Sequence, residues 1–298
     1  MPARTLTTRS ASPVSSPNGQ VVLASAGSGK TTWIARQVAG TRAQRCAVTT
    51  FTVLNAERLR SRITIEAGLV PPRTAVLPWF TFLLQDLIRP YQMSGDLGRI
   101  GGLNFVEARS VPFAKKAQRR YWVDPRGYVY SDKIAELALS LDMGSNGAVL
   151  RRLRRLYAHI YIDEFQDLAG YDLDLIERML AAGLTITMVG DPRQATYSTN
   201  PSARNKKYRG AGVARKVDEW AARGLCNVTN QAHSYRCAPW ICSLADLIYP
   251  ELPTTEPRYE GSASHRGTVI VRSHDVQEYL DIVRPQVLRH DKCSHRPG

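Results

Sequence analysis

Residues 21–32 of this 298-residue chain read VVLASAGSGKTT. The opening VVL is a short apolar run, as expected of a strand buried in a parallel sheet. Gly27 and Gly29 allow a tight turn whose backbone N–H groups point inward at a phosphate. Residues 32–38 then have the composition of a helix, whose N-terminal dipole favours an anion. The pattern predicts a phosphate-binding loop between a strand and a helix.

Two side chains in this loop have chemistry suited to a nucleoside triphosphate. Lys30 offers a point positive charge to the β- and γ-phosphates, and Thr31 offers a hydroxyl to Mg²⁺. A Gly/Ser-rich loop that precedes a helix by chance is the alternative, and the strand–loop–helix context disfavours it. We therefore expect ATP to be bound by a set of nine neighbouring residues: Ala24, Ser25, Ala26, Gly27, Ser28, Gly29, Lys30, Thr31 and Thr32.

A pair of carboxylates follows a second strand-like run. Residues 159–162 read HIYI and lead directly into Asp163 and Glu164. A carboxylate at a strand end beside a phosphate loop holds the metal, so we assign Asp163 to Mg²⁺. Glu164 is then placed to orient and deprotonate the attacking water. The alternative is a solvated acidic loop, which the position after a strand disfavours.

A third strand-like run, LTITMV at residues 184–189, leads to Gln194. A glutamine at a strand end can hydrogen-bond both the γ-phosphate and the attacking water. Read alone, it is a polar loop residue. With Lys30 and Glu164 it completes a predicted ATP-hydrolysing site.

Taken in order, these motifs resemble those of the UvrD/Rep/PcrA-type superfamily 1 DNA helicases. The acidic run DEFQD at residues 163–167 is the family's own form of this motif. The resemblance extends from about residue 20 to about residue 250 and includes further motifs: VTTFT at 48–52, WFTFLL at 79–84, VYSD at 129–132, VGDPRQ at 189–194 and SYR at 234–236.

The resemblance implies roles that the residues alone do not give. Tyr235 would pack on the adenine, and Arg236 would contact the γ-phosphate as a further catalytic group. The implied cofactors are ATP and Mg²⁺, and the implied partner is single-stranded DNA. The implied DNA-contacting residues are Phe51, Thr52, Asn55, Trp79 and Tyr197.

Within this family the chain looks closest to compact UvrD-like proteins of bacteria and phages, some of which serve in phage defence. It departs from the family pattern in four places. An upstream adenine-reading glutamine is not evident, and no base-stacking aromatic follows the Gln194 motif. The insertion is short, and no segment before Gly298 resembles the last two motifs. We therefore expect a second RecA-like domain that is incomplete.

The expected fold is an α/β P-loop NTPase: a RecA-like parallel sheet with helices on both faces, plus the start of a second RecA-like domain. We expect a disordered basic tail at 1–18, a first RecA-like ATPase domain at 19–228 with a small insertion near 93–127, and an incomplete second domain at 229–298. Strands are predicted at Val21–Leu23, Ala47–Phe51, Ile160–Ile162, Thr185–Val189 and Thr268–Arg272. Helices are predicted at Thr32–Val38, Asn55–Ile65, Phe80–Ile88, Lys133–Leu141, Asp172–Ala182, Val213–Arg223, Pro239–Leu247 and Gln277–Leu288.

The charge points to a polyanionic partner. The formal net charge is +14 and the pI is about 9.8. Any single basic cluster can be a solvated face, but together with the DNA-motif resemblance nucleic acid is the better interpretation. Aromatic residues such as Phe51 and Trp79 can stack on bases or pack in the core, and for Phe80 and Phe82 we expect the core. The basic clusters lie at 115–120, 151–155 and 204–209.

The remaining composition excludes several classes of site. Five cysteines and six histidines show no metal-ligand spacing, which favours a reduced, cytoplasmic compartment. No apolar run has transmembrane length, so we expect no membrane partner.

The leading interpretation is an ATP-dependent DNA helicase or translocase of the UvrD type, acting in DNA repair, recombination, plasmid maintenance or phage defence. The alternative is an ATP- and DNA-binding switch or subunit without unwinding activity, with a second subunit completing the motor. The intact Glu164, Gln194 and Arg236 oppose a pure binding role. A small-molecule kinase is disfavoured by the adjacent Asp-Glu pair and the basic charge.

Overall fold

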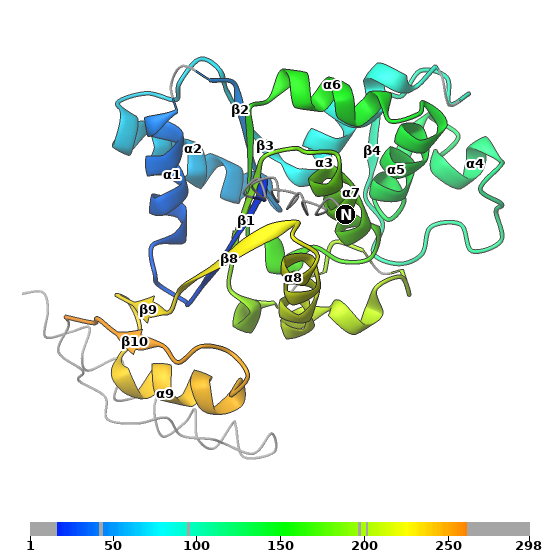
Figure 1. Ribbon diagram of the computed structural model, residues 1–298. Helices are drawn as coiled ribbons and strands as arrows, with labels where there is room; N and C mark the ends of the chain where they lie inside the picture. Colours follow the sequence, from blue (N-terminus) through cyan, green and yellow to red (C-terminus); the bar gives the residue numbers. More distant parts are fainter. Residues whose placement is uncertain (1–16, 42–43, 94–95, 196–197, 201, 261–298) are drawn as a thin grey trace, which may run out of the picture.

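A computed structural model describes residues 17–260, apart from 42–43, 94–95, 196–197 and 201. At its centre is a six-stranded sheet of order β3-β2-β6-β7-β1-β8, and all five neighbouring pairs are parallel (Figure 1). The predicted α/β fold with a parallel sheet is confirmed. The strands are β1 (Gly19–Ala24), β2 (Cys46–Thr50), β3 (Thr74–Pro78), β6 (His159–Asp163), β7 (Ile186–Gly190) and β8 (Cys226–Gln231).

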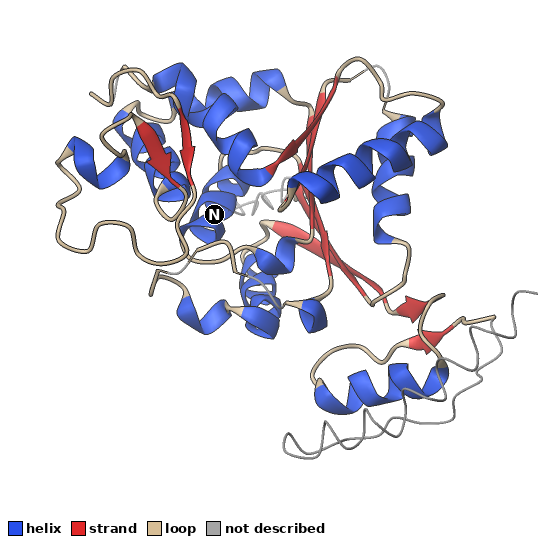
Figure 2. Ribbon diagram, turned by 180° about the vertical axis from the view of Figure 1, so that it is seen from behind, coloured by secondary structure: helices blue, strands red, loops and turns tan. Residues whose placement is uncertain are grey.

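Helices cover both faces of this sheet, because alternate strand residues are apolar on opposite sides. Val22 and Val48 pack in one core with helices α1 (Lys30–Gly40) and α2 (Val53–Ala67). Val21 and Ala47 pack in the other core. Figures 1 and 2 show the two layers on either side of the strands. The second face carries α3 (Trp79–Phe82), α5 (Ile134–Gly144), α6 (Ala148–Leu156), α7 (Tyr171–Ala181) and α8 (Val213–Ala222).

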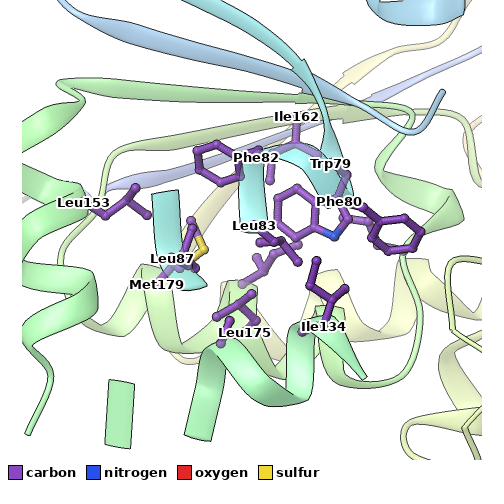
Figure 3. Packing of buried hydrophobic residues seen from close by; sticks show 14 of the residues in the cluster. Trp79, Phe80, Phe82, Leu83, Leu87, Ile134, Leu153, Ile162, Leu175 and Met179 are labelled. Carbon is purple, nitrogen blue, oxygen red and sulfur yellow. The ribbon is translucent and has the colours of Figure 1, made fainter. Parts of the chain in front are cut away.

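The larger core is built around an aromatic turn after β3. Helix α3 continues into a π-helical turn, Leu83–Ile88, whose apolar side chains are buried (Figure 3). Phe80 and Phe82 lie in this core, as predicted. Trp79 is only 1% exposed, and its Nε1 donates to Asp172 Oδ1 at 2.7 Å. The prediction that Trp79 contacts DNA is wrong, because its ring is enclosed by core side chains.

The insertion forms a small unit beside the second face of the sheet. Strands β4 (Gly102–Asn104) and β5 (Tyr128–Tyr130) pair in parallel, with the short helix α4 (Arg119–Trp122) between them in sequence. Tyr121 and Trp122 are buried in the main core, so the insertion is anchored to the sheet domain.

The last described segment leaves the edge strand and lies at the lower left of Figure 1. It contains β9 (His233–Ser234), α9 (Pro239–Ile248) and β10 (Glu256–Pro257), with β9 and β10 paired. Strand β8 pairs with β1 as far as Gln231, three residues beyond the domain boundary expected at 228. The two-domain division stays a prediction, and the elements predicted at 268–272 and 277–288 lie outside the described residues. Across the described ranges, no helix has the length and apolar character needed to cross a membrane.

Candidate functional site

The loop between β1 and α1 has the backbone of a phosphate cradle. Gly27 (φ 74°) and Gly29 (φ 87°) both take left-handed conformations, which glycine adopts without steric cost. A Cβ added at Gly27 would come within 2.5 Å of the Arg236 Cβ, so only glycine fits there.

Helix α1 presents its amino end to the same loop. It begins at Lys30 without a side-chain cap, and the first intrahelical hydrogen bond runs from Trp33 N to Gly29 O at 2.9 Å. The backbone N–H groups of residues 30–32 precede that bond and are therefore available to an anion. The Lys30 side chain, which is largely buried, adds a positive charge to this end.

Asp163 ends β6 as a buried carboxylate. Burial raises its pKa to about 7, and the Glu164 charge adds to the rise while Lys30 opposes it. Its Oδ1 is buried and finds no hydrogen-bond partner within the described ranges. A buried, unpaired anionic oxygen beside a phosphate cradle fits Mg²⁺, with Thr31 as the second protein ligand. Among residues 17–260, leaving aside the short gaps, no cluster of three or more metal-binding side chains occurs, and Mg²⁺ on phosphates needs only one or two.

Glu164 has an unusual backbone, with φ 54°, in the left-handed region. Non-glycine residues avoid this region at a cost of roughly 1–3 kcal/mol, and such strain is concentrated at functional sites. The conformation places Glu164 in the cleft, at the start of a 3₁₀ turn at Phe165–Asp167.

Gln166 links the acidic motif to the next strand. Its Nε2 donates to Glu164 Oε2 at 2.7 Å, and its Oε1 accepts from Asp191 N at 3.1 Å. A Cβ at Gly190 would clash with the Gln166 amide oxygen. Neither Gln166 nor Gly190 was assigned a role from the sequence. The side-chain amide of Gln166 therefore links the Glu164 carboxylate to the loop that carries Gln194.

The predicted groups meet in one cleft of about 360 Å³. Lys30 and Thr31 come from α1, Glu164 from the end of β6, Gln194 from the turn after β7, and Arg236 from the segment after β9. Arg62 of α2 also lines the cleft. The sequence did not indicate that Arg62 would lie there. The full lining is Gly27, Ser28, Gly29, Lys30, Thr31, Thr32, Arg62, Glu164, Gln194 and Arg236.

The segment carrying Arg236 is attached to the phosphate loop through the backbone. Tyr235 N donates to Gly27 O at 3.1 Å, and Ser234 Oγ donates to Ala26 O at 2.6 Å. Tyr235 is 55% exposed, and the Arg258 guanidinium lies over its ring at 6.0 Å. The exposed part of the ring is accessible to a flat group such as a purine. Ser25 Oγ lies 3.0 Å from Thr255 Oγ1, so this second contact joins the loop to the end of the same segment.

Arg193 joins the Gln194 turn to α9. Its guanidinium donates to Asp246 Oδ1 at 3.0 Å and to the Pro253 carbonyl at 2.6 Å. The side chain is 10% exposed, so the ion pair is sheltered from solvent. Any movement of the turn that carries Gln194 would therefore be transmitted to α9 through Arg193. No pattern in the sequence indicated this role.

The candidate DNA-contacting residues lie after β2, at the carboxyl edge of the sheet. Thr52 caps α2, its hydroxyl accepting from Asn55 N at 3.0 Å. Phe51 is half-buried and packs edge-on against Phe80, with ring centroids 5.9 Å apart. The ring centroid of Phe105, in the insertion, lies 6.0 Å from that of Phe80, and Phe105 is 70% exposed. The sequence analysis did not propose Phe105 as a DNA-contacting residue. Tyr197 lies outside the described residues.

Comparisons with known proteins identify the family of the chain. A family model described as an AAA domain (AAA_19) matches residues 9–200. A protein of Carboxydothermus hydrogenoformans named as a subunit of an ATP-dependent helicase/nuclease is 28% identical over 111 residues, which is 36% of this chain and 9% of that protein. The RecB subunit of the RecBCD enzyme of Mycolicibacterium smegmatis is 30% identical over 95 residues, which is 32% of this chain and 8% of that protein.

Among solved structures, the match to Pif1 of Bacteroides sp in complex with ADP-AlF4 covers 70% of this chain and 33% of the Pif1 chain, at 18% identity and a TM-score of 0.27. The matched segments span less than a tenth of the length of either curated relative. The family model and the curated relatives confirm the resemblance to superfamily 1 helicases that the motifs indicate.

Proposed function

Because the chain belongs to the AAA domain family, we propose that it is an ATP-hydrolysing motor of the UvrD type that acts on single-stranded DNA. One observation carries this proposal. Lys30, Thr31, Glu164, Gln194 and Arg236 come from well-separated parts of the chain and line a single cleft. A protein that only bound nucleotide would not need a carboxylate, a glutamine and an arginine directed at one phosphate cradle.

The residues divide the chemistry of phosphoryl transfer among them. Lys30 and the amino end of α1 neutralise the phosphates, and Arg236 and Arg62, which line the same cleft, add positive charge. Thr31 and Asp163 would hold Mg²⁺, which supplies charge neutralisation between the phosphates when bound. Glu164 takes the proton of the attacking water, and Gln194 orients that water.

The finer assignments rest on the relatives. Both curated relatives are, by name, subunits: one of an ATP-dependent helicase/nuclease and the other of the RecBCD enzyme. We therefore favour cytoplasmic work on DNA, in recombination, repair or defence, beside a second subunit. The non-motor switch remains the alternative, and a strand-displacement assay on a tailed duplex separates the two.

The nucleotide part of the proposal is tested with Lys30→Ala. Loss of the charge on the phosphates should lower ATP hydrolysis by about 10²-fold or more and weaken the thermal stabilisation by Mg²⁺-ATP. Lys115→Ala, which removes an exposed lysine of the insertion, is the matched control and should behave as the parent. Hydrolysis at the parent rate in Lys30→Ala would refute the phosphate-loop assignment.

The DNA part of the proposal depends on an exposed aromatic. Phe105 packs on Phe80, which in turn packs on Phe51, and its own ring is open to solvent. Stacking of a base on an aromatic ring contributes about 1–3 kcal/mol. Phe105→Ala should therefore weaken binding of a labelled single-stranded oligonucleotide by about tenfold.

Phe113 provides the control for this experiment. It is a second phenylalanine of the insertion, is 94% exposed, and packs on no other aromatic ring within the described ranges. Phe113→Ala should leave the affinity unchanged. Equal losses in the two variants, or none in Phe105→Ala, would remove Phe105 from the DNA interface.

A further inference from the structure

A second positively charged site lies at the opposite end of the sheet from the nucleotide cleft. Arg45 immediately precedes β2, Arg73 immediately precedes β3, and Arg155 lies in the last turn of α6. They line a groove of about 520 Å³, here named the arginine groove. The rest of its lining is Pro72, Thr74, Ala75 and Leu156.

The groove is separate from the proposed motor face. Strand β2 runs from Cys46 to Thr50, and the candidate DNA-contacting residues follow its carboxyl end, whereas Arg45 stands at its amino end. Five residues of extended chain span ~16 Å. In Figure 1, α6 lies at the top, where β6 begins, and the turn from β1 to α1 lies at the lower left.

The sheet fixes the main chains of these arginines. Cys46 N donates to the Arg73 carbonyl at 3.1 Å, and Ala158 N donates to the Arg45 carbonyl at 2.8 Å. Both bonds extend the parallel ladder by one residue at its amino edge. Adjacent strands lie about 4.8 Å apart, so the two arginines start from neighbouring, rigid positions.

The charges of Arg45 and Arg155 are not neutralised by carboxylates. None of the seven residues that line the groove is acidic. Within the described ranges, no ion pair involves Arg45 or Arg155, and both side chains are exposed. The nearby Asp86 carboxylate accepts from the Tyr157 hydroxyl at 3.0 Å, and the Arg45 guanidinium lies over that tyrosine ring at 5.4 Å.

Helix α6 extends the positive surface beyond the groove. Val149, Leu150 and Leu153 are buried against the core, which leaves the opposite side of the helix facing outward. Arg151 and Arg154 are exposed there. Arg151 and Arg154 thus form an exposed basic surface next to Arg155 of the groove, whereas Arg152 is half-buried and donates to the Asp86 carbonyl at 2.8 Å.

We propose that the arginine groove binds the phosphate backbone of double-stranded DNA, as a second nucleic-acid site. Guanidinium groups pair with phosphate oxygens in a bidentate fork, and those of Arg45 and Arg155 have no ion-paired carboxylate among the described residues. Its lining contains no aromatic residue on which an unpaired base could stack, in contrast to the surface around Phe105. Contacts to phosphate alone suit a duplex, whose bases are already stacked.

The test compares two double variants of equal net charge. Arg45→Gln with Arg155→Gln removes two arginines of the groove. Arg126→Gln with Arg215→Gln removes two exposed arginines elsewhere and serves as the control. Binding of a blunt duplex of about 20 base pairs is measured by fluorescence anisotropy over a range of salt concentrations. The same titration with a single-stranded oligonucleotide, and ATP hydrolysis, follow in parallel.

The groove variant should bind the duplex more weakly, and the slope of log K against log salt should fall by about 2, one for each lost phosphate contact. Arg45→Lys with Arg155→Lys should recover most of the slope, because the charge returns. Single-strand binding and hydrolysis should match the parent, so failure of the proposed motor function would be seen separately. The proposal is overturned if the parent does not bind the duplex, if both glutamine pairs lose affinity equally, or if an acidic peptide binds the groove and duplex does not.

Discussion

At the scale of single residues, the nucleotide site is defined by groups that the fold alone does not satisfy. Asp163 is buried with one oxygen unpaired among the described residues, and Glu164 occupies a left-handed backbone conformation. Both features cost stability in the nucleotide-free chain. They are explained together if a cation and phosphates complete the site.

The cost at Asp163 predicts a pH effect. A carboxyl whose pKa rises from 3.8 to about 7 on folding holds its proton more tightly in the folded state. Its contribution to stability is therefore largest below pH 3.8 and is lost as the pH rises to about 7. Asp163→Asn keeps a neutral group there, so it should raise the free energy of unfolding at about pH 8 by on the order of 1–3 kcal/mol, with little change at about pH 4.

Urea unfolding of the nucleotide-free chain at the two pH values measures this effect. Asp174→Asn, which changes a carboxylate that pairs with Arg204 at the surface, is the control and should show no gain at the higher pH. An equal gain at both pH values in Asp163→Asn would mean that the buried carboxylate is not charged at the higher pH.

The residues predicted from the sequence are those that lie within contiguous motifs. Lys30, Glu164, Gln194 and Arg236 each follow or belong to a recognisable run, and they meet in the cleft. The residues that were missed are placed by tertiary packing. Arg62 lies on α2, Phe105 lies in the insertion, and Gln166 acquires a role only through β7.

At the scale of elements, α3 is held to α7 by a buried polar contact. Asp172 lies in the first turn of α7 and accepts from Trp79 Nε1 at 2.7 Å and from Thr199 Oγ1 at 2.6 Å. Burial raises the pKa of Asp172 to about 6, although these hydrogen bonds oppose the rise. The acceptor fixes the turn after β3 against the core.

Removing that acceptor should destabilise the fold. Asp172→Ala leaves the indole N–H and the Thr199 hydroxyl buried without this acceptor, and we expect a loss of roughly 2–4 kcal/mol in urea unfolding. Asp172→Asn keeps a carbonyl oxygen for the indole and should lose clearly less. Similar losses in both variants would assign the effect to charge or packing, and not to the hydrogen bonds.

Sequence periodicity identified four of the six strands of the central sheet, β1, β2, β6 and β7, and missed β3 and β8. Strand β8 reads CNVTNQ and pairs on one side only within the described sheet, so it has no apolar run to reveal it. Strand β3 was missed although Ala75, Val76 and Leu77 form an apolar run; it ends in Pro78, directly before the aromatic run of α3. Helix α6 was not predicted, because four of its nine residues are arginines. Its buried apolar side is formed by Val149, Leu150 and Leu153.

At the scale of the whole molecule, the two proposed sites lie at opposite ends of the parallel strands. The nucleotide cleft and the Phe51–Phe105 surface lie at the carboxyl edge, and the arginine groove lies at the amino edge. A net charge of +14 favours nucleic acid at both ends. The central claim nevertheless concerns the cleft, namely that it hydrolyses ATP with Glu164 as the base.

The most direct measurement is single-turnover ATP hydrolysis by Glu164→Gln beside the parent chain. Glutamine keeps the shape of the side chain but cannot accept the proton of the attacking water. Mg²⁺-ATP should still raise the melting temperature of the variant, while hydrolysis should fall by about 10²-fold or more. Hydrolysis at the parent rate would contradict the account, and so would loss of ATP binding together with turnover, because Glu164 would then serve the nucleotide and not the water.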